Sequence, residues 1–226
     1  MNPEFWQSRW QEGRIGFHQS EVNPLLKAYF STLNVAKGGR ILVPLSGKSL
    51  DMAWLTQQGY EVIGIELVES AVEEFFAEQG ITPTVTQASN NADIKHYQGQ
   101  LSGQTIELWV ADIFALTAAD IGNVDAVYDR AALIALPEDM RLRYSEQIRK
   151  MSDLATQLLI TLNYDQSQKD GPPFSVNKTQ IQQYYGNYYQ ITELENEDST
   201  LNANAALSVT EHVWLLNAAN DIFNTQ

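Results

Sequence analysis

Four residues near the ends of predicted strands have side chains that can bind a small molecule: Glu66, Asp112, Asp129 and Arg130. A carboxylate there can accept hydrogen bonds from sugar hydroxyls or ring amino groups, and a guanidinium can hold an anion with paired donors. Structural roles are the alternative. Glu66 and Asp112 can each cap a following helix, and Arg130 can form a surface ion pair with Asp129. The turns beside these residues help to decide between the two.

The turn "SGKS" at residues 46–49 follows an apolar run at 40–45 and resembles the end of the phosphate-binding motif G-x-x-x-x-G-K-[ST]. The first glycine of that motif would fall at Leu42, inside the predicted strand, so the loop is too short to wrap a triphosphate. The dinucleotide motif G-x-G-x-x-G fails as well, because Leu45 and Leu50 stand where its other glycines belong. The turn is therefore predicted not to bind phosphate.

Glu66 ends the second predicted strand, 19 residues after Gly47. This is about the offset at which a carboxylate reaches a ribose diol. The sequence thus keeps the ribose acceptor and lacks the phosphate cradle, a combination that fits a nucleoside without phosphates. S-adenosylmethionine is the common cofactor of that kind. At the end of the third strand, the Asp112 carboxylate and the Ile113 amide are placed to meet its adenine.

Composition narrows the possible partners. The chain has 226 residues and a formal net charge of −14, so its surface repels phosphate backbones and no nucleic-acid partner is expected. No apolar run reaches the ~18 residues of a membrane span, no secretory signal is evident, and there is no cysteine. We expect a cytoplasmic monomer. His18, His96 and His212 lie far apart, which argues against a metal site, and His18 is interpreted as structural.

The elements that position these residues alternate along the chain. Predicted strands cover 40–45, 61–66, 105–110, 124–129, 157–162, 188–194 and 209–216, and the clearest helical patterns cover 49–58, 69–79 and 137–154. The alternation predicts an α/β fold with a mostly parallel sheet covered on both faces. The last two strands, joined by "ENEDSTLNANAAL", are expected to pair antiparallel at the sheet edge.

We expect a single domain over residues 1–226 with two added segments. Residues 1–35 are helical and aromatic-rich, and residues 81–104 are polar with turn signals, typical of a surface insertion that can include a short hairpin. Trp6 and Trp10 lie four apart on one helical face. Such a pair is typical of core packing, and it also suits a segment that folds over a cationic, aromatic cofactor.

Five ordered blocks make the chain similar to the thiopurine S-methyltransferase family, close to its bacterial members: "EFWQSRW" followed by "IGFHQSEVNP", "VPLSGKSLDMAWL", "GYEVIGIEL", "YDRAALIALP" and "NYDQSQKDGPPF". The resemblance covers nearly the whole length. The family turn usually reads P-L-C-G-K, and Ser46 replaces its cysteine. The resemblance implies the Rossmann-like class I methyltransferase fold, a three-layer αβα sandwich. Its mostly parallel sheet has seven strands, the last of them antiparallel.

The resemblance also implies S-adenosylmethionine as cofactor, S-adenosylhomocysteine as product, and methyl transfer to thiopurines and other aromatic or heterocyclic thiols. It implies cofactor contacts from Trp6, Trp10, Leu45, Glu66, Asp112, Ile113 and Arg130, and an acceptor contact from Phe17. It favours the interpretation of residues 1–35 as a lid. Arg130 is expected to be catalytic, favouring an anionic acceptor directly or through water.

Other functions stay open from the sequence. The same fold and cofactor can serve halide, selenium or tellurium acceptors, because acceptor choice depends on the loops around residues 10–20 and 165–176. A nicotinamide-dependent oxidoreductase is a weaker alternative, since the glycines are missing. A non-catalytic nucleoside-binding module is a third. "GPPF" at 171–174 resembles the D/N-P-P-F/Y loop of enzymes that methylate amino groups, but it follows a different strand and is interpreted as a rigid turn lining the site.

Overall fold

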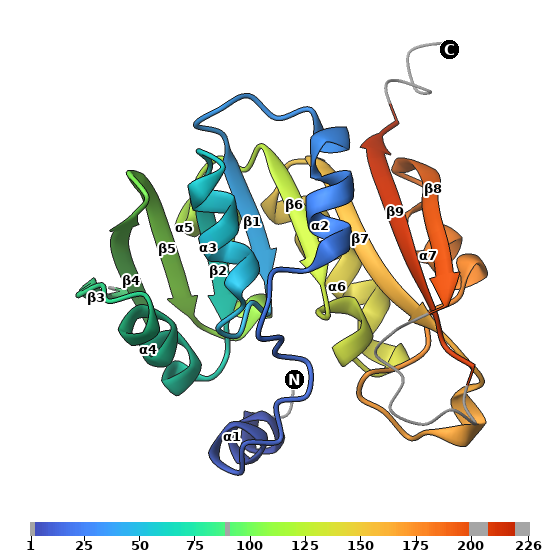
Figure 1. Cartoon of the computed structure of the whole chain (residues 1–226), viewed down its shortest axis with the longest axis horizontal. Coiled ribbons are helices and arrows are strands. Elements are labelled where there is room, and N and C mark those ends of the chain that lie inside the picture. The colour runs from blue at the N-terminus through green and yellow to red at the C-terminus, as the bar shows by residue number, and fades with distance from the viewer. Residues whose placement is uncertain (1–2, 89–90, 199–207, 220–226) are drawn as a thin grey trace.

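A computed structural model describes residues 3–88, 91–198 and 208–219. The nine strands of these residues form one sheet in the order β3-β4-β5-β2-β1-β6-β7-β9-β8 (Figure 1). The strands are β1 Arg40–Pro44, β2 Glu61–Glu66, β3 Thr84–Ala88, β4 Asn91–Leu101, β5 Gln104–Val110, β6 Ala126–Arg130, β7 Thr156–Asn163, β8 Tyr189–Asp198 and β9 Thr210–Ala218. The helices are α1 Pro3–Gln11, α2 Pro24–Tyr29, α3 Leu50–Gln57, α4 Glu69–Glu78, α5 Ala118–Ile121, α6 Glu138–Met151 and α7 Lys178–Tyr185. Short 3-10 helices are η1 Phe30–Leu33, η2 Ile113–Ala115, η3 Leu133–Ala135 and η4 Gln166–Gln168.

The predicted alternation is confirmed. β5, β2, β1, β6 and β7 are parallel, β9 pairs antiparallel with β7, and β8 pairs antiparallel with β9 at the edge of the sheet. The predicted helical pattern at 137–154 was too long at its end. α6 stops at Met151 because Asp153 and Leu154 adopt left-handed backbone angles, with φ of 48° and 61°, that no helix can include.

The prediction of seven strands was too low. Segment 81–104 contains β3 and β4, a hairpin whose second strand pairs with β5 and extends the sheet. The short hairpin considered for this segment is present, but its polar composition gave no sign that it joins the main sheet, since β3 is an edge strand with mostly exposed side chains. Only a few apolar residues anchor the hairpin, among them Tyr97, which stacks on Phe76 of α4 at 6.1 Å between ring centroids. Residues 89–90 of this segment, and 199–207 of the predicted β8–β9 connection, lie outside the described residues.

Helices cover both faces of the sheet (Figure 1). α2, η1, α3 and α4 pack on one face, and α5, α6 and α7 pack on the other. The parallel strands are apolar on both sides, as the neighbouring residues Val62 and Ile63 of β2 show, because each belongs to a different core cluster and both are buried. No helix of the described residues has the length and apolar character that a membrane crossing requires.

This layering brings the carboxyl ends of five parallel strands to one edge of the sheet. α1 lies beyond that edge, outside both helical layers (Figure 1). Its Trp10 packs against Val68 and Ala71 at the start of α4. Any site at the strand ends therefore lies between the sheet and the N-terminal segment.

Candidate active site

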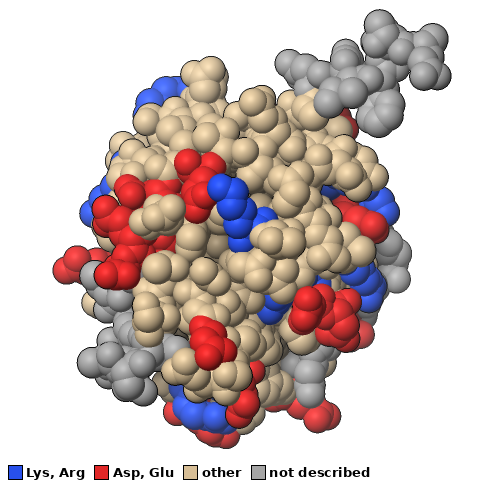
Figure 2. Space-filling view, turned by 90° about the vertical axis from the view of Figure 1, so that its right-hand side faces the viewer, with Lys and Arg blue, Asp and Glu red and all other residues tan. Residues whose placement is uncertain are grey.

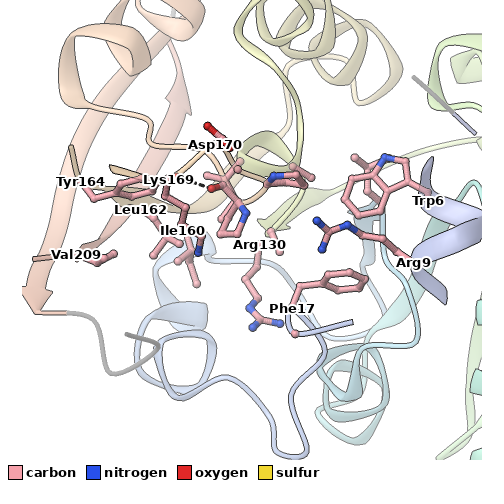
Figure 3. Close-up of a pocket in the computed structure, with 18 of the residues that line it drawn as sticks. Trp6, Arg9, Phe17, Arg130, Ile160, Leu162, Tyr164, Lys169, Asp170 and Val209 are labelled. Atoms are coloured by element: carbon pink, nitrogen blue, oxygen red, sulfur yellow. Dashed lines mark hydrogen bonds between the residues drawn. The ribbon is translucent and has the colours of Figure 1, made fainter. Parts of the chain in front are cut away.

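A cavity of about 800 Å³ lies at the carboxyl ends of the parallel strands. Its walls come from the N-terminal segment, from the carboxyl ends of β2, β6 and β7, from the residues that follow these strands and β1, and from the start of β9. Figure 3 shows Trp6 and Arg9 on one side, Tyr164 and Val209 on the other, and Arg130 between them. The volume is that of a typical small-molecule pocket.

Most of the predicted site residues line this cavity, namely Trp6, Trp10, Phe17, Leu45, Glu66 and Arg130. Asp112 and Ile113 are not among its lining residues. Ile113 is fully buried in the core, and the Asp112 carboxylate accepts the backbone N–H of Phe114 at 3.0 Å, capping η2. The capping alternative thus describes this side chain in the structure, and its contact with adenine stays a prediction.

In the turn after β1, the two groups that could bind an anion, the Gly47 N–H and the Lys48 ammonium, already bind carboxylates of the protein. The backbone N–H of Gly47 donates to Oε2 of Glu66 at 2.8 Å. The Lys48 ammonium pairs with Glu74 at 2.8 Å and Glu78 at 2.6 Å, both on α4. An amide and a lysine that already serve carboxylates do not form a phosphate cradle, which agrees with the missing glycine at Leu42.

Glu66 is held rigidly at the end of β2. Glu66 is 7% exposed and lines the cavity, and its Oε1 accepts the backbone N–H of Val68 at 2.8 Å. Burial raises the pKa of this carboxyl group, and the N–H groups of Val68 and Gly47 oppose the rise. Each oxygen keeps a second lone pair after these bonds, so the carboxylate can also accept hydrogen bonds from hydroxyls of a ligand.

Three aromatic side chains form a wall opposite the sheet. Phe17 meets Trp6 and Trp10 edge to face, with ring centroids 5.9 and 5.7 Å apart. Gly47 lets this wall approach the turn, because a Cβ there would lie 3.2 Å from Cζ2 of Trp10. Aromatic faces and a carboxylate acceptor in one cavity fit an adenosine cofactor with a cationic sulfonium.

Arg130 ends β6 as a half-buried cation. Within the described part of the chain its guanidinium makes no hydrogen bond or ion pair. The ion pair with Asp129 considered from the sequence is therefore not formed. Asp129 is fully buried on the other side of the strand, where it accepts the Tyr144 hydroxyl at 2.7 Å and the Leu133 N–H at 3.2 Å. Burial raises the pKa of Asp129 to about 6.

The loop after β7 closes the far end of the cavity. Gly171, Pro172 and Pro173 of "GPPF" line it, so the predicted lining turn is found where expected. The loop is fixed by the Tyr164 hydroxyl, which donates to the Pro173 carbonyl at 2.6 Å, and by the Phe174 N–H, which donates to the Ile134 carbonyl at 2.7 Å.

Several lining residues were missed from the sequence, chiefly Ile160 and Leu162 of β7 and Glu211 of β9. The position of Glu211 could have been inferred from the strand topology. The last strand was expected to be antiparallel, and the first residues of an antiparallel strand lie beside the carboxyl ends of the parallel strands.

The N-terminal segment is anchored where it enters α2. Asn23 caps that helix, and its backbone N–H donates to Oδ1 of Asp51 at 2.8 Å. Oδ2 of Asp51 accepts the hydroxyl of Tyr128 at 2.9 Å, so the anchor reaches β6. His18 lies in a small recess beside Lys48. Burial, with the charges of Lys48 and Arg130, lowers the pKa of His18.

A family model described as thiopurine S-methyltransferase matches residues 1–218. This chain belongs to the thiopurine S-methyltransferase family. A thiopurine S-methyltransferase of Psychrobacter cryohalolentis is 62% identical over 217 residues, covering 96% of this chain and 99% of the relative. One from Pseudomonas syringae pv. syringae is 47% identical over 222 residues, covering 96% and 98%. As a member of the family, the protein is an S-adenosylmethionine-dependent methyltransferase.

Solved structures that resemble the chain support the predicted fold. A methyltransferase from Anabaena variabilis gives a TM-score of 0.65 at 14% identity and covers 96% of both chains. A magnesium protoporphyrin IX methyltransferase from Synechocystis, solved with bound SAH, gives 0.61 at 14% identity, covering 94% of this chain and 97% of that one. At such identities the likeness concerns the fold, and the predicted class I methyltransferase fold is confirmed.

Ser46, which replaces the cysteine of the usual turn of the thiopurine S-methyltransferase family, is buried. Its hydroxyl has no hydrogen-bond partner among the described residues. A Cβ at Gly64 of β2 would lie 2.9 Å from Oγ of Ser46. The position therefore favours a small side chain with little need of hydrogen bonds, which either residue supplies.

Proposed function

We propose that this enzyme transfers the methyl group of S-adenosylmethionine to the sulfur of thiopurines and of other aromatic or heterocyclic thiols. The observation that carries the proposal is a single cavity that joins the Glu66 carboxylate and an aromatic wall to a half-buried cation, Arg130. The first two features suit the cofactor, and the third suits an acidic acceptor.

The cofactor-binding groups we propose lie at the end of the cavity near α1. Glu66 would accept the ribose hydroxyls, while Trp6 and Trp10 would cover the cofactor, with Leu45 beneath it. Asp112 and Ile113 would contact adenine from the end of β5. When bound, S-adenosylmethionine supplies a methyl group on a cationic sulfonium, which is activated for displacement by a nucleophile.

The acceptor would lie between Phe17 and the loop after β7. Apolar side chains from Ile160 and Leu162 exclude water there, and the fixed loop limits the orientations of a flat ring. Arg130 would favour the thiolate form electrostatically. Aromatic and heterocyclic thiols ionise readily, so the mechanism needs no strong general base. We therefore assign no such role to His18.

We further propose one domain over residues 1–226, with residues 1–35 as a lid and 81–104 as an insertion. We also propose a cytoplasmic monomer that does not bind nucleic acid. The net charge of −14 supports the last point. On the side of the molecule beyond β8, acidic clusters alternate with small basic groups (Figure 2).

Calorimetric titration with S-adenosylhomocysteine, followed by methyl transfer to a panel of thiols, tests the proposal. We expect binding of the product and transfer to thiopurines and thiophenols. Binding without transfer to any thiol would indicate a nucleoside-binding module. Transfer only to halide, selenium or tellurium compounds would keep the cofactor and change the acceptor. Failure to bind S-adenosylhomocysteine would overturn the assignment of the cavity.

A further inference from the structure

The acceptor end of the cavity contains two half-buried side chains of opposite charge. Arg130 comes from the end of β6 and Glu211 from the start of β9. Lys169 and Asp170 line the same end, but both are exposed, so solvent screens their charges. Arg130 and Glu211 are therefore the pair that a bound acceptor meets with least screening.

The register of the sheet places these two side chains on one face. Arg130 is opposite Ile160, and Glu211 is opposite Leu162. Paired residues share a face, and so do residues two apart on a strand. β6 and β9 lie two strand spacings apart, about 10 Å. Ile160 and Leu162 of β7, the strand between β6 and β9, line the cavity, so an apolar floor separates the two charges. Figure 3 shows these two apolar side chains between Arg130 and Val209.

The Glu211 carboxylate has unused acceptor capacity. Among the described residues it accepts no hydrogen bond and forms no ion pair. Its partial burial raises the pKa of the carboxyl group, and the positive charge of Arg130 opposes the rise. A carboxylate that is half withdrawn from water is stabilised by a ligand that donates an N–H to it.

We propose that Glu211 is a specificity-determining residue that accepts a ring N–H of the acceptor while the sulfur of the same ring lies toward Arg130. This inference rests on the proposed function. It assigns as preferred acceptors those heteroaromatic thiolates that keep an N–H away from the sulfur, as a fused imidazole ring does. Thiols of equal size without that N–H leave the carboxylate unsatisfied and are disfavoured.

Two thiols of matched shape test this. The thiolate of 5-mercaptobenzimidazole keeps an N–H in the fused imidazole ring, away from the sulfur, whereas the thiolate of 5-mercaptobenzoxazole has no N–H. We expect Glu211→Leu to lower the ratio of kcat/KM for the first thiol to kcat/KM for the second by about tenfold to hundredfold relative to the unsubstituted enzyme. Glu211→Gln keeps one acceptor oxygen and should give an intermediate ratio. Differences in thiol acidity cancel, because each ratio is compared between enzymes.

Glu197→Leu is the matched control, since Glu197 lies opposite Glu211 on β8, is exposed and does not line the cavity. Its ratio should stay unchanged. Thiophenol activity and S-adenosylhomocysteine titration accompany every variant. Retained thiophenol activity with an unchanged ratio in Glu211→Leu would overturn this inference alone. An equal loss for both heterocycles would also overturn it, because Glu211 would then act on the fold or on Arg130. Absence of thiol methylation by the unsubstituted enzyme would overturn the proposed function as well.

Discussion

The Glu66 carboxylate and the Gly47 amide are joined by a 2.8 Å hydrogen bond, so the acid that ends β2 also closes the turn that follows β1. One side chain thereby fixes two adjacent strand ends around the cavity. The same bond occupies the amide that a phosphate-binding turn would offer to its ligand. The cofactor site is therefore built on a carboxylate that is already oriented before the ligand arrives.

Glu66→Gln should weaken S-adenosylhomocysteine binding by about tenfold to hundredfold, because a charged acceptor of ribose hydroxyls is replaced by a neutral amide. Calorimetric titration measures the change. Glu61→Gln is the control on the same strand, since Glu61 faces Arg40 at 3.4 Å at the opposite end of β2. If the Glu66→Gln and unsubstituted enzymes bind S-adenosylhomocysteine with equal affinity, Glu66 does not recognise the ribose.

Arg130→Ala should lower kcat/KM for thiols by about tenfold to hundredfold, with the greatest loss for the least acidic thiols, because the guanidinium no longer favours the thiolate. Arg130→Lys keeps a positive charge and should therefore retain part of the kcat/KM that Arg130→Ala loses. The measurement is the pH dependence of kcat/KM across a thiol series. Arg143→Ala, on α6 over the Phe114 ring, is a matched loss of charge outside the cavity. Full activity of Arg130→Ala with an unchanged pH profile would exclude this role.

Gly47→Ala should destabilise the protein by about 1–2 kcal/mol and weaken S-adenosylhomocysteine binding. The new Cβ meets both a left-handed backbone, with φ of 52°, and the Trp10 ring at 3.2 Å. Denaturant unfolding and calorimetry measure the two effects. Gly80→Ala has a similar φ of 67° and open space around the new Cβ, so it should show the backbone effect alone. Identical behaviour of the two variants would contradict contact between Trp10 and the turn.

Asp129 should make stability depend on pH. Its folded pKa of about 6 lies above the ordinary 3.8, so the folded state binds more protons than the unfolded state between these values. Stability from this group is present below about pH 4 and is lost as the pH rises through 6, by roughly 3 kcal/mol. Asp129→Asn does not titrate and should therefore gain stability relative to the unsubstituted protein over this range. Denaturant unfolding at several pH values gives the difference, and a difference independent of pH would refute the prediction.

The strands and helices that bury apolar residues were predictable, because the spacing of their apolar residues shows which of their faces are buried. β2 was predicted with its observed bounds, and its residues are apolar on both sides. The β3–β4 hairpin was not counted because an edge strand with exposed side chains has no such pattern. Its position depends on pairing with β5, which is a long-range contact.

The site residues at the ends of parallel strands were predictable, because the carboxyl ends of parallel strands always lie together at one end of the sheet. Glu66 and Arg130 both follow from that rule. Asp112 obeys it too, but the chain after β5 turns at once into η2, and the carboxylate caps that helix. Glu211 required knowledge of which strand β9 joins, since a strand's start reaches this edge only in an antiparallel position.

The hydrogen bonds from Asn23 and Tyr128 to Asp51 give the N-terminal segment a fixed root beside the strand that carries Arg130. We expect the part of the segment before Asn23, the lid proposed above, to open about this root. Such an opening would break the packing of Trp10 on Val68 and Ala71 and leave the sheet intact. Release of the spent cofactor would then need only a local change, which also withdraws Phe17 and leaves the strand ends and the loop after β7 in place.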